Sequence, residues 1–74
     1  RNLSRLFIRE TGMTFAQWRL QARLRIAMNL LLDGLPVGQV ARRVGYLSVS
    51  AFVAAFRKEV GQTPGAVQGE LLEA

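Results

Sequence analysis

The stretch Val37 to Val60, VGQVARRVGYLSVSAFVAAFRKEV, has the pattern of two short helices separated by a turn. In its first part, apolar residues recur at spacings of three and four, which gathers them on one face of a helix: Val37, Val40, Ala41 and Val44. Gly45 follows where a left-handed residue ends many helices, and the hydroxyl of Ser48 can cap the next helix. The stretch therefore predicts a helix-turn-helix with its turn at Gly45 to Ser48.

The second part of this stretch predicts a helix with one buried and one exposed face. Its apolar positions at helical spacing are Phe52, Ala55, Phe56 and Val60. The residues left largely on the opposite side are Val49, Ser50, Val53, Ala54, Arg57 and Lys58. A face with small side chains near the helix N-terminus and cations near its C-terminus suits a major groove and the phosphates beside it. The same spacings also build ordinary two-helix corners, so the pattern alone leaves both interpretations open.

Length and composition limit the classes of protein that this chain can belong to. Its 74 residues are enough for one small domain or a piece of one, and no run approaches the ~20 apolar residues of a membrane span. The chain contains no cysteine and no histidine, which removes the usual zinc ligands, thiol nucleophiles and the commonest general base. We therefore expect a soluble protein that is not an enzyme and needs no metal or cofactor.

The charge balance predicts an anionic partner. Ten basic residues stand against five acidic ones, for a net charge of +5, and nine of the ten are arginines. The guanidinium of arginine is suited to bidentate contact with guanine or phosphate. We place nucleic acid ahead of a membrane surface as the partner. Because the chain begins at Arg1 without a signal-peptide pattern, we also expect a fragment of a longer cytoplasmic protein.

The residues before the central stretch predict two more helices. Arg1 to Glu10 is basic and amphipathic, with Leu3, Leu6 and Phe7 on one face, and can be either a solvated surface helix or one that touches nucleic acid. Thr14 and Gln17 then match a capping box that opens a long helix to about Leu32. Its expected apolar surface, broad enough to pack at both ends, comprises Phe15, Trp18, Ala22, Leu24, Ala27, Leu30 and Leu31. We expect its arginines to be solvated or paired with carboxylates: Arg19, Arg23 and Arg25.

The junctions on either side of the central stretch are short. Asp33 and Gly34 end the long helix, and Pro36 suits a helix entrance, so we expect a stiff connection. Gly61 ends the second helix of the stretch, and Thr63-Pro64 predicts a last helix to about Leu72. This acidic tail, with Glu70 and Glu73, is expected to pack or fray rather than to bind DNA.

A faint internal repeat, SRLFIRETGMT near the start and AAFRKEVGQTP near the end, suggests two similar units in tandem. Four segments extend this observation over nearly the whole chain: LSRLFIRETGMTFAQWR, RLRIAMNLLLDG, VGQVARRVGYLSVSAF and FRKEVGQTP. Through these segments the chain resembles the C-terminal DNA-binding region of the AraC/XylS family of bacterial transcription regulators.

The resemblance implies an all-α fold of tandem helix-turn-helix units, homeodomain-like three-helix subdomains joined by one long connector helix. Each unit would insert a recognition helix into successive major-groove segments on one face of the DNA. Residues 1–13 would then be the remnant of an incomplete first unit, residues 14–33 the connector, and residues 34–74 the second unit with a C-terminal helix. The implied protein is a bacterial transcription regulator, expected to be an activator that also touches RNA polymerase on the nucleoid.

The resemblance also assigns DNA-facing residues by position. Those implied to face base edges are Arg1, Asn2, Ser4 and Arg5 in the first unit and Val49, Ser50, Val53 and Ala54 in the second. Those implied to lie near phosphates are Arg9, Ser48, Arg57 and Lys58. Arg5 is the leading candidate for a base contact, because a bidentate arginine–guanine pair supplies about 1–3 kcal/mol of discrimination. The second helix has no Arg, Gln or Asn at its central outward positions, so we expect it to position more than it specifies.

Two departures from the family pattern carry further expectations. The helices that precede the first recognition helix in the family are missing, so Leu3, Leu6 and Phe7 are expected to be exposed, frayed or buried against another copy of the chain. The aromatic residue common after the Thr-Pro pair is replaced by Ala66-Val67-Gln68. The alternative to DNA binding is a helical interaction module that binds a sigma factor or another regulator without touching DNA.

Overall fold

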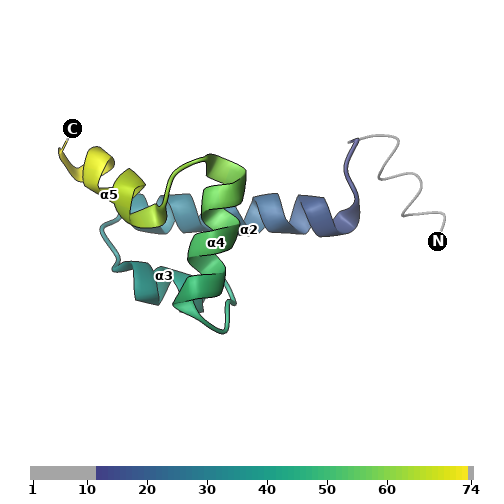
Figure 1. Cartoon of the computed structure of the whole chain (residues 1–74), viewed down its shortest axis with the longest axis horizontal. Coiled ribbons are helices and arrows are strands. Elements are labelled where there is room, and N and C mark those ends of the chain that lie inside the picture. Colours follow the sequence, from purple (N-terminus) through teal and green to yellow (C-terminus); the bar gives the residue numbers. More distant parts are fainter. Residues whose placement is uncertain (1–11, 74) are drawn as a thin grey trace.

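The chain folds into α-helices alone over residues 12–73, the part described by the computed structural model. The helices are α2 (Phe15–Leu32), α3 (Val37–Arg43), α4 (Val49–Val60) and α5 (Pro64–Glu73). As Figure 1 shows, α3, α4 and α5 gather around the C-terminal half of α2, while its N-terminal half extends beyond them. The expected all-α class is confirmed.

The long helix α2 begins and ends at the residues that the sequence predicted. The backbone N–H of Gln17 donates to Thr14 Oγ1 at 3.1 Å, and that of Thr14 donates to Gln17 Oε1 at 2.9 Å, which completes the capping box. At the other end Gly34 is left-handed, with φ +87°. The N–H groups of Gly34 and Leu35 donate to the carbonyls of Leu31 and Leu30, which satisfies carbonyls of the last turn.

The predicted turn between α3 and α4 is present and has the same physical cause. Gly45 is left-handed, with φ +89°, and the N–H groups of Gly45 and Tyr46 donate to the carbonyls of Arg42 and Ala41. The N–H of Ala51 then donates to Ser48 Oγ at 3.1 Å, so Ser48 caps α4 as expected. This turn makes α3 and α4 a helix-turn-helix corner.

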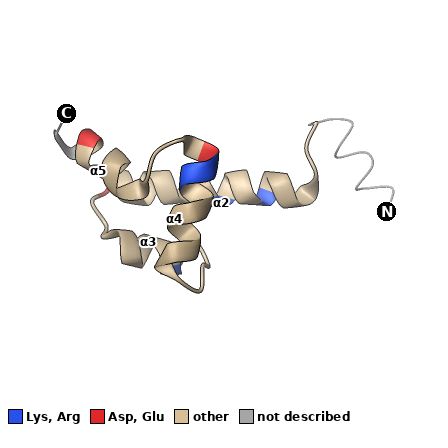
Figure 2. Cartoon of the chain, viewed as in Figure 1, with Lys and Arg blue, Asp and Glu red and all other residues tan. Residues whose placement is uncertain are grey.

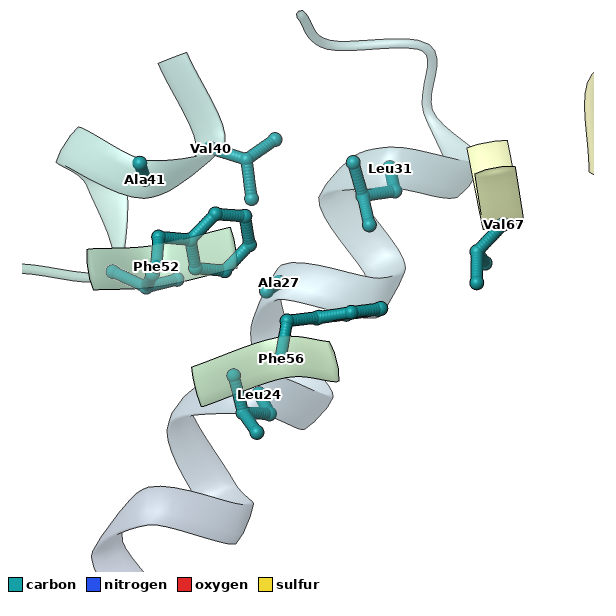
Figure 3. Close-up of a cluster of buried hydrophobic side chains, with 9 residues drawn as sticks. Leu24, Ala27, Leu31, Val40, Ala41, Phe52, Phe56 and Val67 are labelled. Carbon is teal, nitrogen blue, oxygen red and sulfur yellow. The ribbon is translucent and has the colours of Figure 1, made fainter. Parts of the chain in front are cut away.

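One hydrophobic core holds the four helices together, and its central members are drawn in Figure 3. The two phenylalanines of α4, Phe52 and Phe56, are fully buried against the face of α2 that carries Leu24, Ala27 and Leu31. Tyr46 extends the aromatic cluster. The ring centroids of Tyr46 and Phe52 are 5.5 Å apart, and those of Phe52 and Phe56 are 5.7 Å apart. The other buried hydrophobic residues are Val40, Ala41, Val44 and Val67.

The last helix, α5, packs onto the connector. Thr63 Oγ1 accepts from the N–H of Ala66 at 3.2 Å and caps the helix, while Pro64 and Val67 are buried. The side-chain amide of Gln68 donates to the carbonyl oxygens of Leu31 at 3.1 Å and Leu35 at 2.7 Å. Val67 and Gln68 therefore attach this helix in a segment where the sequence lacks the family's aromatic residue.

One expectation about the core was wrong. Val60, expected on the buried face of α4, is 40% exposed, because the last turn of the helix lies beyond the buried pair of phenylalanines. On α2, Phe15 and Trp18 keep 43% and 49% of their surface exposed, and they lie in the half of the helix that α3, α4 and α5 do not surround. The buried residues of the connector, Leu24, Ala27 and Leu31, lie in the half that these helices surround.

Candidate nucleic-acid interface

The exposed face of α4 is the leading candidate for contact with DNA. Ser50 and Ala54 are exposed on this helix, whereas Phe52 and Phe56 anchor its opposite face in the core. Because that anchor is rigid, the exposed face has a defined direction. The hydroxyl of Ser50 can donate or accept a hydrogen bond, and the methyl group of Ala54 can contact a thymine methyl.

The two valines assigned to this face are placed differently from each other. Val49 is 45% exposed and lies beside Gly38 of α3. A methyl group added to the Cα of Gly38 would be in van der Waals contact with Val49 Cγ2, at 3.9 Å. Val53 is half-buried, so it presents less surface than an outward position would. Together they leave a narrow outward surface of small side chains on α4.

Polar and charged groups lie at both ends of α4. Ser48 is exposed at its N-terminus, where its hydroxyl already accepts the capping hydrogen bond from Ala51. Arg57 and Lys58 are exposed in its last turn, next to the acidic Glu59. Figure 2 shows this change from basic to acidic residues at the end of α4. Their positive charges lie at the C-terminal end of the helix dipole, where cations stabilise a helix.

The residues assigned to the first unit lie outside the described residues. These are the base-facing Arg1, Asn2, Ser4 and Arg5, the backbone-facing Arg9, and the apolar Leu3, Leu6 and Phe7. Of the predicted first unit only Gly12 and Met13 are described, and Gly12 is left-handed with φ +74°. This is the conformation expected for a residue that ends a helix.

The connector carries three arginines in two different settings. Arg19 and Arg25 are exposed, in agreement with the expectation of solvated side chains. Arg23 differs, because it is half-buried and its Cζ lies 5.1 Å from the centroid of the Tyr46 ring. This cation–π contact joins α2 to the turn that precedes α4.

A pair of exposed arginines, Arg42 and Arg43, was not assigned any role from the sequence. They form the last turn of α3, and together with Gln39 they line an open hollow of about 440 Å³. The sequence did contain a signal for this surface. Arg42 and Arg43 stand between two apolar positions of the helix, Ala41 and Val44, which are buried, so both arginines point outward.

The described residues offer neither a metal-binding cluster nor a membrane-spanning helix. Over residues 12–73, no three His, Cys, Asp or Glu side chains gather in a way that could hold a metal ion. The helices of that same segment also include none with the length and apolarity needed to cross a bilayer.

Comparison with known proteins identifies the family. A family model described as a helix-turn-helix domain matches residues 1–70. The chain is 49% identical over 65 residues to the HTH-type transcriptional regulator NimR of Escherichia coli, an alignment that covers 88% of this chain and 24% of that protein. It is 39% identical over 64 residues to the HTH-type transcriptional regulator RipA of Corynebacterium diphtheriae, covering 86% of this chain and 19% of RipA.

A third relative is also named as an HTH-type transcriptional regulator. The HTH-type transcriptional regulator YdeO of Escherichia coli is 38% identical over 63 residues, which cover 85% of this chain and 25% of YdeO. The chain thus spans about a quarter or less of the length of these relatives. No solved structure matches it significantly.

Proposed function

The chain belongs to the AraC-type helix-turn-helix family of bacterial transcription regulators, and we propose that it binds double-stranded DNA sequence-specifically, with α4 in a major groove. The observation that carries this proposal is the division of α4 into two faces. Phe52 and Phe56 are fully buried, whereas Ser50, Ala54 and Arg57 are exposed. A helix anchored in this way can enter a groove without rearranging its own core.

The chemistry of α4 supports a contact that positions the protein more than it reads sequence. Ser50 offers one hydroxyl, and Ala54 and the exposed part of Val49 offer methyl groups for a thymine. Arg57, Lys58 and Ser48 are the proposed partners of backbone phosphates on either side. Such contacts fix the register of a protein on DNA but do not themselves distinguish bases.

The first recognition helix, within residues 1–13, is proposed to carry most of the base discrimination. Arg1, Asn2, Ser4 and Arg5 would face bases and Arg9 the backbone, as the family pattern implies. The 18 residues of α2 support a tandem arrangement, because a helix of that length spans about 27 Å and successive major-groove segments on one face lie about 34 Å apart. In this arrangement residues 14–33 are the spacer and residues 34–74 the second unit.

The alternative, a helical module that binds a sigma factor without touching DNA, is not favoured. The family match and the named relatives support DNA-binding regulation. The two functions also differ in a measurable property, because release of counterions makes duplex binding fall steeply with salt. Association with an acidic protein surface has no condensed counterion layer to release.

The experiment that tests the proposed function is fluorescence-anisotropy binding to a randomised duplex pool over a salt series. We expect a steep negative salt dependence and enrichment of a sequence, with Arg5→Ala relaxing one enriched position and Arg57→Gln weakening binding to all sequences. Glu70→Gln, on the exposed surface of α5, is the control variant that leaves base selection unchanged. Absence of duplex binding at low salt would refute the function.

Activation of transcription through RNA polymerase, and self-association through Leu3, Leu6 and Phe7, stay predictions. In vitro transcription from a promoter that carries the selected site would test the first. Sedimentation of the chain with and without Leu6→Ser would test the second.

A further inference from the structure

An open hollow rimmed by arginines lies where the connector leaves the helix-turn-helix corner. We call it the arginine hollow; its volume is about 390 Å³, and its lining includes Arg19, Arg23 and Ile26 from α2 and Arg43 and Gly45 from the end of α3. Two helices that are separate in sequence therefore bring three arginine side chains to the border of one hollow. No carboxylate from the described residues lines it.

The three arginines are held to different degrees. Arg23 is half-buried and stacked on Tyr46, which is itself packed against the buried ring of Phe52. The guanidinium of Arg23 therefore loses little further freedom when it binds an anion. Arg19 and Arg43 are exposed, so their charged ends can adjust around the same ligand.

Apolar side chains make up the rest of the lining of the hollow, among them Ala22, Ile26 and Val44. Ile26 is 55% exposed, although it belongs to a helix whose opposite face forms the core. An apolar lining with a cationic rim fits a sugar–phosphate backbone, in which deoxyribose carbons lie between charged phosphates. Guanidinium groups bind such phosphates through charge-assisted, bidentate hydrogen bonds.

The position of the hollow relates it to α4. Tyr46, which stacks with Arg23, stands two residues before Ser48, the N-cap of α4. The lining residue Gly45 belongs to the same turn, so the hollow adjoins the turn that leads into the N-terminus of α4. The N-terminal half of α2, which carries Arg19 and Arg23, extends beyond the other helices (Figure 1).

We infer that the arginine hollow binds the phosphodiester backbone of the duplex between the two major-groove segments, through Arg19, Arg23 and Arg43. This inference rests on the proposed tandem DNA binding and adds a third contact to it. The connector is then a DNA-contacting element as well as a spacer. The sequence alone predicts that Arg19 and Arg23 are solvated or paired with carboxylates, and this inference gives both residues a function in DNA binding instead.

The test is the salt dependence of binding of the whole chain to its selected duplex. Arg19→Gln and Arg43→Gln should each lower the magnitude of the slope of log K against log salt by about one, since each removes one phosphate contact. Both residues are exposed, so circular dichroism should show unchanged folding. Arg25→Gln is the matched control, because it removes the same charge from α2 but lines a different hollow beside Glu59.

A backbone-neutralisation scan locates the contact. The duplexes carry one uncharged methylphosphonate each, placed between the two major-groove segments. At one or two positions this substitution should weaken binding of the wild-type chain relative to the unmodified duplex. At the same positions it should leave binding of the Arg43→Gln variant unchanged. If Arg19→Gln and Arg43→Gln keep the slope of the Arg25→Gln control, the inference is overturned while DNA binding stands. If the wild-type chain shows no salt-dependent binding, the proposed function fails and the inference fails with it.

Discussion

The side-chain amide of Gln68 donates a 2.7 Å hydrogen bond to the backbone carbonyl oxygen of Leu35, 33 residues earlier in the chain. The same amide donates to the carbonyl of Leu31 at 3.1 Å, so one side chain joins α5 to the last turn of α2 and to the loop that enters α3. Both hydrogen bonds are partly buried. Gln68 thereby ties the last helix to the junction between the connector and the helix-turn-helix corner.

Removal of this amide should destabilise the fold. We expect Gln68→Ala to lower the free energy of unfolding by about 1–3 kcal/mol, since it removes two hydrogen bonds to partly buried carbonyls. Gln68→Glu keeps the shape but replaces the donor by a carboxylate, and at neutral pH it should cost at least as much. Urea denaturation measures both, with the exposed Gln62→Ala as control. A Gln68→Glu variant as stable as the wild type would contradict this role.

Substitution of Ser48 should separate its structural role from its proposed role in DNA binding. Ser48→Ala removes the acceptor for the Ala51 N–H and should cost about 1 kcal/mol of stability. Ser48→Asp keeps a capping acceptor and adds a charge that favours the helix N-terminus, so stability should be retained. Thermal denaturation and duplex binding are measured together. Affinity for DNA should fall in the Asp variant, because its carboxylate repels phosphate; unchanged affinity would place Ser48 away from the backbone.

The contrast between Phe56 and Val60 on α4 should appear in stability. Phe56→Ala should cost about 3–5 kcal/mol, because it leaves a cavity in the core, and that is most of the stability of a domain of this size. Val60→Ala should cost less than about 1 kcal/mol, because this side chain is 40% exposed. Denaturant unfolding of both variants decides the matter. A loss of several kcal/mol in the free energy of unfolding of Val60→Ala would show instead that this residue is part of the core.

The stacking of Arg23 on Tyr46 should be measurable as a coupling energy. In a double-mutant cycle of Arg23→Ala and Tyr46→Leu, we expect the two losses to be non-additive by about 0.5–2 kcal/mol. Each variant alone also loses packing, and the cycle subtracts that contribution. Additive losses would show that the contact does not stabilise the fold. The coupling should persist at high salt, since a partly buried pair is screened less than exposed charges.

Local signals predicted most of the helix boundaries. The capping box at Thr14, the left-handed Gly45 and Gly61, and the N-cap Ser48 all lie where the sequence placed them. Each depends on hydrogen bonds between residues a few positions apart, so a short window of sequence contains the necessary information. The exposure of Ser50 and Ala54 followed for the same reason, because their direction is set by the period of the helix.

Within residues 12–73, the sequence by itself thus determined the helices, their ends and the helix-turn-helix corner. Tertiary structure decided which parts of those helices other helices cover, and so Val60 is exposed despite its apolar side chain. It also brought Gln68 to Leu35, Arg23 to Tyr46, and three arginines of two helices to one hollow. These contacts depend on where helices cross and how they are rotated against each other, which the packing of the whole core sets and no local pattern encodes.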